Sequence, residues 1–526
     1  IGDYAFALWD KDRRRLILAR DPMSARPLHY HRGRGFFAFA SMPKGLHALP
    51  EIPYAPDEER AAEFLALMPE YGPRSFFRDI SRVEGGQWVE VTPAGFAVRR
   101  HWEPRRETLR RSSGDHVEAL REQLDRAVAA RLRRVDGPIG TQLSAGLDSA
   151  GVAATAARLL APRGETIAAF TSAPREGYHG PAPPGRIIDE SGLAGATAAS
   201  YPNMDHVVVR PDGSGLVDEL DRDFFLFERP VLNACNQLWL RAIYAEAQRR
   251  KIGVMLTGTM GNFTISYAGR ELLPELAGSG RWLGLLRQWR AQTRSGRVGW
   301  RGLLAATFGP WIPARLWLAL QRFDKGSEIG VDRYSALSSE RLDSLDLEAR
   351  ARERGLDLAY RPSRDGFSAR LLGLRRVDMG NVNKGVLAGW GVDLRDPTSD
   401  RRLVEFCLSL PGEAFVQDGL PRSLALRGLA DRLPPEVIAE KRKGLQAADW
   451  HEAIAASRER LREEIERIGE VPAAARALDL ARMRRLIDEW PSDGWHLRQA
   501  ETDYRLALLR GVVSGHFLRR ASRSNA

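Results

Sequence analysis

The sequence predicts an α/β protein built from two parts. Short apolar runs joined by polar turns fill residues 1–105, which indicates a β-rich domain. From residue 115 to 526, strand patterns first alternate with helix patterns, which predicts a doubly wound parallel sheet. Helical patterns then dominate from about residue 270, so we expect the sheet domain to continue into a helical C-terminal extension. The polar stretch 103–114 is the expected boundary between the two parts.

The N-terminal part is expected to be a mostly antiparallel sheet. Residues 4–9 and 16–20 are apolar runs separated by a polar turn, which predicts a β-hairpin. Other patterns in this part predict two more strands and one helix, at residues 36–40, 87–91 and 56–67.

The second part carries apolar residues at helical spacing over residues 116–134. Further along, strands and a helix are predicted in alternation, at residues 139–143, 150–160, 166–172, 207–210 and 254–257. Alternation of this kind requires crossover connections, and crossovers join parallel strands.

Composition narrows the classes of function. The net charge of +11 favours anionic partners, but the excess arginines are scattered, so a nucleotide is a better expectation than nucleic acid. Cys235 and Cys407 lie far apart outside any metal-binding pattern, which argues against disulfides and zinc. No apolar run reaches the roughly 18 residues of a membrane span. We expect a cytoplasmic protein without a membrane partner. The first residue is Ile rather than Met, so the natural N-terminus is expected to lie upstream.

The most informative segment is the loop at residues 142–149, between a predicted strand and a predicted helix. Backbone N–H groups at a helix N-terminus bind anions, and Ser144 and Ser149 add hydroxyl donors. Gly146 is expected to permit a tight turn. Asp148 would repel a bare phosphate, so it predicts Mg²⁺ shared with the phosphates. The alternative is a simple helix cap.

Residues 144–149 resemble the pyrophosphate loop of ATP pyrophosphatases. Further motifs in the same order resemble the asparagine synthetase family, at residues 5–10, 18–21, 26–30, 37–41, 390–397, 400–406 and 441–444. This resemblance implies a glutaminase-like (Ntn-type) domain at 1–105, apparently truncated, and an ATP-pyrophosphatase domain at 115–526 with a helical insertion at about 270–370.

The resemblance also implies an ATP site. Its phosphates would be held by Leu143, Ser144, Ala145, Gly146, Leu147, Asp148 and Ser149. Thr171 and Ser172 would touch the adenine, and Thr257 and Gly258 match a later strand end of the family. The family's catalytic lysine position falls on Arg442. Lys441 and Lys443 flank it, which leaves open which cation acts.

Two departures from the family pattern shape the expected reaction. Acidic residues of the family are replaced here by Thr259, Asn262 and Phe263. We expect substitutes among Asp378, Asp393 and Asp396. Glutamine hydrolysis needs an N-terminal cysteine, and no cysteine precedes Cys235. Either the nucleophile has been lost with an upstream fragment or the domain is inactive.

The predicted function is ATP-dependent amide formation: a side-chain carboxylate is adenylated and joined to an amine, giving AMP and pyrophosphate. The sequence resembles lasso-peptide cyclases and β-lactam synthetases, so the expected substrate is a precursor peptide that closes into a macrolactam. A peptidase and a peptide-recognition protein are the implied partners. Five tryptophans are expected to line a peptide groove or to pack in the core: Trp282, Trp289, Trp300, Trp311 and Trp317. The alternatives are a glutamine-hydrolysing asparagine synthase acting on aspartate, a tRNA-modifying ATP pyrophosphatase and an inactive scaffold.

Overall fold

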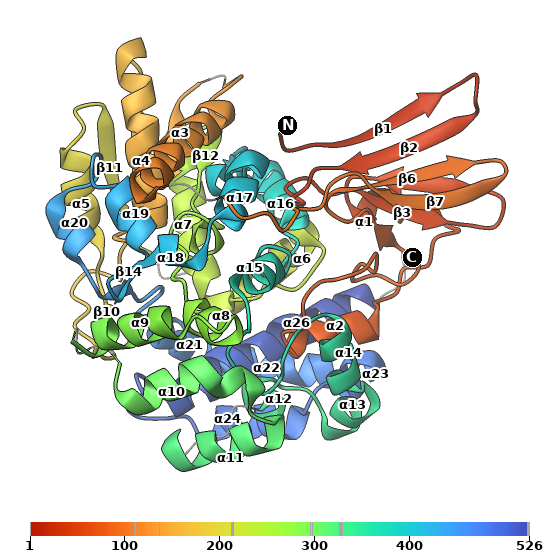
Figure 1. Cartoon of the computed structure of the whole chain (residues 1–526). Helices are drawn as coiled ribbons and strands as arrows, with labels where there is room; N and C mark the ends of the chain where they lie inside the picture. The colour runs from red at the N-terminus through yellow and green to blue at the C-terminus, as the bar shows by residue number, and fades with distance from the viewer. Residues whose placement is uncertain are drawn as a thin grey trace.

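The computed structural model describes residues 2–109, 112–135, 137–211, 215–294, 296, 298–325 and 330–522. In Figure 1 the N-terminal strands lie on one side of the molecule and the helices of the later chain on the other. The middle of the expected boundary, residues 110 and 111, lies outside the described residues.

The N-terminal part contains two antiparallel sheets. The first has the order β1-β2-β6-β7, formed by β1 (Ala5–Asp10), β2 (Arg15–Arg20), β6 (Gln87–Thr92) and β7 (Gly95–Arg100). Ala5 pairs with Arg20 and Asp10 with Arg15, which confirms the predicted hairpin. The second sheet has the order β4-β3-β5, formed by β3 (His29–Arg32), β4 (Phe37–Ala40) and β5 (Ser81–Arg82).

Two short helices complete this part, α1 (Pro43–Leu46) and α2 (Glu58–Leu65). The side chain of Asp57 accepts a hydrogen bond from the Arg60 amide at 2.8 Å, which fixes the start of α2. Helix α2 also contacts the C-terminal helix α26 (Leu509–Ala521), where Phe517 packs against Phe76 and Phe77. The two ends of the chain therefore share one apolar core.

The second part is built on a parallel sheet of order β11-β9-β8-β12-β13. Its strands are β8 (Ile139–Gln142), β9 (Ile167–Ser172), β11 (Met204–Val209), β12 (Val254–Leu256) and β13 (Asp393–Arg395). Strand β9 lies on one side of β8, and β12 lies on the other. The chain order thus reverses at β8, and ligands of such sheets bind at the carboxyl ends of the strands where this happens.

Four helices accompany this sheet: α3 (Ser113–Arg131), α4 (Leu147–Leu160), α5 (Ser191–Ala199) and α7 (Ala234–Arg249). Helix α4 buries a row of small residues that includes Ala150, Ala153 and Ala157. Because these side chains are short, α4 packs closely against its neighbours, and its first turn stands directly after β8.

Strand β13 differs from the expectation, since the sequence predicts a mostly helical chain after about residue 270. It follows α16 (Gly380–Trp390) and pairs with β12, with Leu394 buried between two charged residues. Three residues with a single apolar side chain give no strand pattern, so pairing with β12 decides this element.

The remainder of the chain is mostly helical, as predicted. The helices used below are α6 (Leu220–Phe227), α8 (Leu272–Gly278), α9 (Trp282–Arg294), α10 (Trp300–Phe308), α11 (Ala314–Lys325), α15 (Gly366–Leu374), α17 (Arg401–Ser409), α19 (Ser423–Gly428), α21 (Trp450–Ala456) and α22 (Arg458–Gly469). Among the described residues, no helix has both the length and the apolar character to cross a membrane.

Candidate functional site

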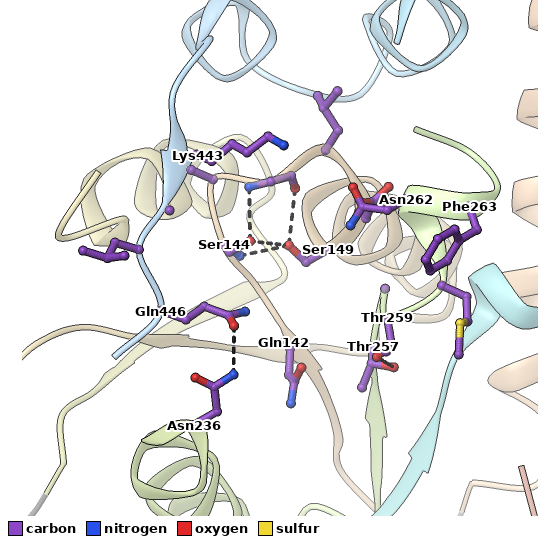
Figure 2. A pocket seen from close by; sticks show the side chains of 18 of the residues that line it. Gln142, Ser144, Ser149, Asn236, Thr257, Thr259, Asn262, Phe263, Lys443 and Gln446 are labelled. Atoms are coloured by element: carbon purple, nitrogen blue, oxygen red, sulfur yellow. Dashed lines mark hydrogen bonds between the residues drawn. The ribbon is translucent and has the colours of Figure 1, made fainter. Parts of the chain in front are cut away.

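A cavity of about 2300 Å³ opens at the carboxyl ends of β8, β9 and β12. The loop after β8 forms one wall, and α7 and the loop around Lys443 form others (Figure 2). The cavity continues past the sheet to α11, where Trp317 lines it. This volume is much larger than a nucleotide site alone requires, because drug-sized ligand sites usually occupy roughly 300–1,000 Å³.

The loop between β8 and α4 is held by its own hydroxyl groups. The Ser144 and Ser149 hydroxyls are 2.7 Å apart, and the Ser144 amide donates to Ser149 Oγ at 3.2 Å. The Gly146 amide donates to Ser144 Oγ at 3.1 Å. Gly146 is the N-cap of α4 with φ −76°, so its backbone is extended and the tight turn expected from glycine is wrong.

One backbone amide of this loop already donates a hydrogen bond to a carboxylate. The Ala145 amide donates to Glu190 Oε1 at 3.1 Å, and burial raises the pKa of Glu190. A Cβ atom on Gly444 would lie 1.8 Å from Glu190 Oε2, so glycine is required where Glu190 passes that chain. The loop therefore accepts anionic oxygen atoms, as a phosphate-binding loop must.

Asp148 is packed against the segment that follows β12. A Cβ atom on Gly258 would lie 2.8 Å from the Asp148 carbonyl carbon, and one on Gly261 would lie 2.2 Å from Asp148 Cγ. These two glycines allow the backbone to approach the first turn of α4. Beside them, the Thr259 hydroxyl donates to Thr257 Oγ1 at 3.3 Å.

Asp148 and Asp396 form a pair of acids in the cavity wall. Burial raises the pKa of each to about 6, and the charge of Asp396 raises that of Asp148 further. Asp396 accepts hydrogen bonds from Thr398 and from the Met260 amide. Oδ1 of Asp148 is buried beside the Ser266 hydroxyl, but neither atom makes a hydrogen bond of normal geometry with a described residue.

These two carboxylates fit Mg²⁺, which prefers oxygen ligands and usually binds through one or two carboxylates together with substrate phosphates. Within the described ranges, no cluster of three or more His, Cys, Asp or Glu side chains could hold a metal. Substrate oxygens would therefore have to complete the shell.

The other two acids named as substitutes lie away from the cavity lining. Asp378 is bound by Arg20 at 2.6 Å and by Arg82 at 2.9 Å. Asp393 is bound by Arg26 at 2.7 Å and by Arg395 at 2.8 Å. Their charges are already compensated, so the expectation that they act at the site is corrected: of the three candidates, the structure brings only Asp396 to Asp148.

The basic cluster at residues 441–443 is divided by the fold. Arg442 is bound to Glu440 at 2.7 Å. Lys443 lies in β16 (Lys443–Gly444), which pairs in parallel with β10 (Arg186–Ile187), and its side chain extends above the Ser144–Ser149 loop (Figure 2). The geometry therefore favours Lys443 over Arg442 as the cation of the site.

The residues expected near the adenine lie at the end of β9 and line the cavity with Thr257 and Gly258. Thr171 is buried, and its hydroxyl is 2.9 Å from Nε2 of His206 on β11. Ser172 is half-buried. Thr171 thus contributes its backbone and its methyl group rather than a free hydroxyl.

The five tryptophans of the helical segment are separated by the fold. Trp317 lines the cavity, and its indole N–H is buried without a hydrogen bond to a described residue. Trp289 donates to Thr307 Oγ1 at 3.0 Å within the α8–α10 core. The others are exposed on the outer surface: Trp282, Trp300 and Trp311.

Sequence reasoning missed several charged residues of the cavity wall, among them Arg186, Glu190, Arg270 and Arg422. None belongs to a motif used above. They come from three separate segments, around residues 186–190, 270 and 422, so only the folded chain brings them together.

Two models of known protein families match this chain, one for each of its two parts. The family model for asparagine synthase matches residues 119–510, and that for a glutamine amidotransferase domain matches residues 1–102.

Three curated relatives illustrate the likeness. Asparagine synthetase [glutamine-hydrolyzing] 3 of Bacillus subtilis is 32% identical over 157 residues, 30% of this chain and 25% of that protein. A putative asparagine synthetase [glutamine-hydrolyzing] of Mycobacterium tuberculosis is 32% identical over 167 residues, again 30% and 25%. Amidase chry2 of Gibberella zeae is 27% identical over 279 residues, 49% of this chain and 38% of that protein. The matches thus span well under half the length of each relative.

Proposed function

This chain belongs to the asparagine synthase family, and from that premise we propose that it is an ATP-dependent amidoligase. The proposed reaction adenylates a side-chain carboxylate and joins it to an amine, with release of AMP and pyrophosphate. The observation that carries the proposal is the Ser144–Ser149 loop, which carries the acid Asp148 and shares one cavity with Lys443 and Asp396.

In this proposal the loop amides and the two serine hydroxyls bind phosphate oxygens, and Lys443 neutralises the charge that develops on the leaving group. Asp148 and Asp396 would hold Mg²⁺, which neutralises phosphate charge when it is bound. Thr171, Ser172, Thr257 and Gly258 border the nucleotide base and sugar at the strand ends.

For the acceptor side we propose a precursor peptide whose own amine closes a macrolactam. The length of the cavity supports this, since it runs from the phosphate loop to Trp317 in the helical segment. A peptide also accounts for Thr259, Asn262 and Phe263, because an amine held within the same substrate does not depend on the acids that the family carries at those positions. A peptidase and a peptide-recognition protein are the proposed partners.

The two cysteines of the sequence are both buried, and burial raises the pKa of each thiol to about 12. Neither is a thiolate at neutral pH, so neither is a candidate nucleophile for glutamine hydrolysis. The second candidate function is asparagine synthesis from aspartate, which is the activity for which the two bacterial relatives are named.

One experiment separates these candidates. The protein is incubated with Mg·ATP and either peptides that carry a free N-terminal amine and an internal Asp or Glu, or aspartate with ammonium. Macrolactam formation is expected to give AMP and a peptide lighter by one water in mass spectrometry. Asparagine in the second reaction would favour the alternative, and absence of AMP from both would contradict the amidoligase proposal.

Ser149→Ala tests the loop in the same assay. It should lower AMP formation strongly, because it removes the hydroxyl that meets Ser144. Ser200→Ala, at the exposed C-terminal end of α5, is the matched control and should retain activity.

A further inference from the structure

Four positively charged side chains meet at one end of the cavity: Arg186, Arg270, Arg422 and Lys443. Burial lowers the pKa of Lys443, and the charges of Arg422, Arg270 and Arg186 lower it further. Each of the three arginines is therefore close enough to Lys443 to repel its charge, and this repulsion opposes the fold unless an anion lies among them.

None of the four has a carboxylate within 4 Å among the described residues. Arg422 donates to the neutral side chain of Asn262 at 3.2 Å, and Arg186 donates to the Gly444 carbonyl at 3.3 Å. Two arginines elsewhere on the surface show the contrast, since Arg158 contacts Asp431 at 2.8 Å and Arg281 contacts Glu413 at 2.5 Å.

The fold holds these cations in place from separate segments. Arg186 and Lys443 lie on the paired strands β10 and β16. Arg422 follows the hairpin of β14 (Val416–Gln417) and β15 (Leu420–Pro421), whose tip packs on α9: a Cβ atom on Gly419 would lie 2.8 Å from the Ala291 carbonyl carbon. Arg422 itself has φ +59°, a left-handed conformation that is unfavourable for arginine. Such strain persists where the surrounding structure imposes it, often at functional sites.

We propose that Arg186, Arg270 and Arg422 form, together with Lys443, a pyrophosphate-binding pole that captures the β- and γ-phosphates of ATP. This inference rests on the proposed function and deepens it. All four residues come from outside the loop at 143–149.

The reaction explains why such a pole is useful. When a substrate carboxylate oxygen attacks the α-phosphorus, a new P–O bond forms and the bond from the α-phosphorus to the bridging oxygen breaks. The electron pair of that bond leaves with pyrophosphate. Cations placed around the leaving group stabilise this charge, and guanidinium groups bind phosphate oxygens through two parallel hydrogen bonds. Asn262 suits this arrangement, because an acid there would neutralise Arg422.

Direct binding of pyrophosphate tests the proposal without requiring turnover. Calorimetry is performed with pyrophosphate, with ATP and with inorganic phosphate, on the full chain and on Arg422→Gln, Arg270→Gln and the double variant. Each single variant should bind pyrophosphate about tenfold more weakly, as expected for one charge-assisted contact, and the double variant more weakly still. Arg158→Gln removes the same charge from a paired surface site and should bind as the original chain does.

Thermal unfolding of each variant shows whether it remains folded. Unchanged pyrophosphate affinity in folded Arg422→Gln and Arg270→Gln would overturn the proposal, as would equal losses in Arg158→Gln. If arginine-dependent pyrophosphate binding is found but no substrate yields AMP, the pole stands and the proposed function fails. If AMP forms but neither Arg422→Gln nor Arg270→Gln changes the affinity for pyrophosphate, the proposed function stands and the pyrophosphate-binding pole is wrong.

Discussion

The molecule contains two clusters of acids that differ in whether neighbouring arginines compensate their negative charge. Glu70 and Asp378 lie between the N-terminal part and α16. Burial raises the pKa of Glu70, but Arg229, Arg60 and Arg82 together lower it below its usual range. Burial acts likewise on Asp378, and Arg20 and Arg82 lower its pKa. In the cavity, burial raises the pKa of Asp148 and Asp396 to about 6. Nearby hydrogen bonds and arginine charges lower these pKa values, but not enough to bring them back to the usual range.

This difference distinguishes a structural cluster from a binding site. A closed network of acids and arginines holds two parts of a chain in register and is destabilised when one member is removed. An acid that remains uncompensated in a cavity costs stability and is retained where a ligand supplies the missing charge. The four cations of the same cavity, which have no carboxylate within 4 Å in the part of the chain that the structure describes, are the complementary case.

The largest expected effect concerns the closed cluster, which is the network of Glu70 and Asp378 with their arginines. Asp378→Asn leaves Arg20 and Arg82 without their shared carboxylate, and breaking a buried pair in this way costs about 3–5 kcal/mol. Chemical denaturation of the variant should show this loss in the free energy of unfolding. Glu122→Gln, at an exposed acid paired with Arg126 on α3, is the control and should lose less than about 1 kcal/mol. Equal stability of Asp378→Asn and the original chain would remove the comparison.

The two acids of the cavity, Asp148 and Asp396, should behave in the opposite way. Asp148→Asn should lower AMP formation about 100-fold or more, the usual scale for losing a group that stabilises transition-state charge. Its free energy of unfolding should stay equal or rise, because an uncompensated buried carboxylate is removed.

A thermal shift on addition of Mg²⁺ with pyrophosphate gives a readout other than activity. The shift should disappear in both Asp148→Asn and Asp396→Asn and persist in Asp205→Asn, an exposed acid of β11. A full shift in the first two variants would show that these carboxylates bind no metal.

The contrast between the clusters also shows what sequence could reveal. The strand patterns at 4–9, 16–20 and 166–172 and the loop at 142–149 are local, so short-range reasoning recovers them. Asp396 was one of three equal candidates, because charge compensation depends on contacts from distant segments. Arg26 and Arg395 form ion pairs with Asp393. Arg20 lies more than three hundred positions from its partner Asp378.

The same reason explains the missed residues of the pyrophosphate-binding pole. Arg186, Arg270 and Arg422 resemble any other arginine in an arginine-rich chain. Only tertiary structure shows that, among the described residues, no carboxylate pairs with them. Likewise, β13 is a strand because β12 offers it a free edge, not because its three residues favour one.

An intermediate case tests how far burial alone moves an acid. Glu228 ends α6, next to Arg229, and burial raises its pKa to about 8 although Lys44 opposes the shift. The folded state then holds the proton between the unfolded pKa near 4.5 and about 8, so stability is highest below that window and falls as pH rises through it.

Glu228→Gln should therefore flatten the decline in the free energy of unfolding across this window by about 1–3 kcal/mol. Denaturation at pH 5 and pH 8.5 measures it. Glu118→Gln on the exposed face of α3 should leave the decline as it is. A decline that survives Glu228→Gln would assign the pH dependence to another group.

The smallest expected effect lies at the phosphate loop itself, where Glu190 accepts the Ala145 amide that a phosphate oxygen would need. If the carboxylate competes with the nucleotide, then Glu190→Gln should tighten ATP binding, since the amide oxygen still accepts the hydrogen bond but the negative charge is gone. The gain should be about two- to fivefold, because one partly screened charge is removed. Asp189→Asn removes the neighbouring exposed charge and should change ATP affinity less. Weaker binding by Glu190→Gln would mean that the carboxylate orients the loop for the nucleotide, which would place Glu190 with the closed cluster as a structural acid.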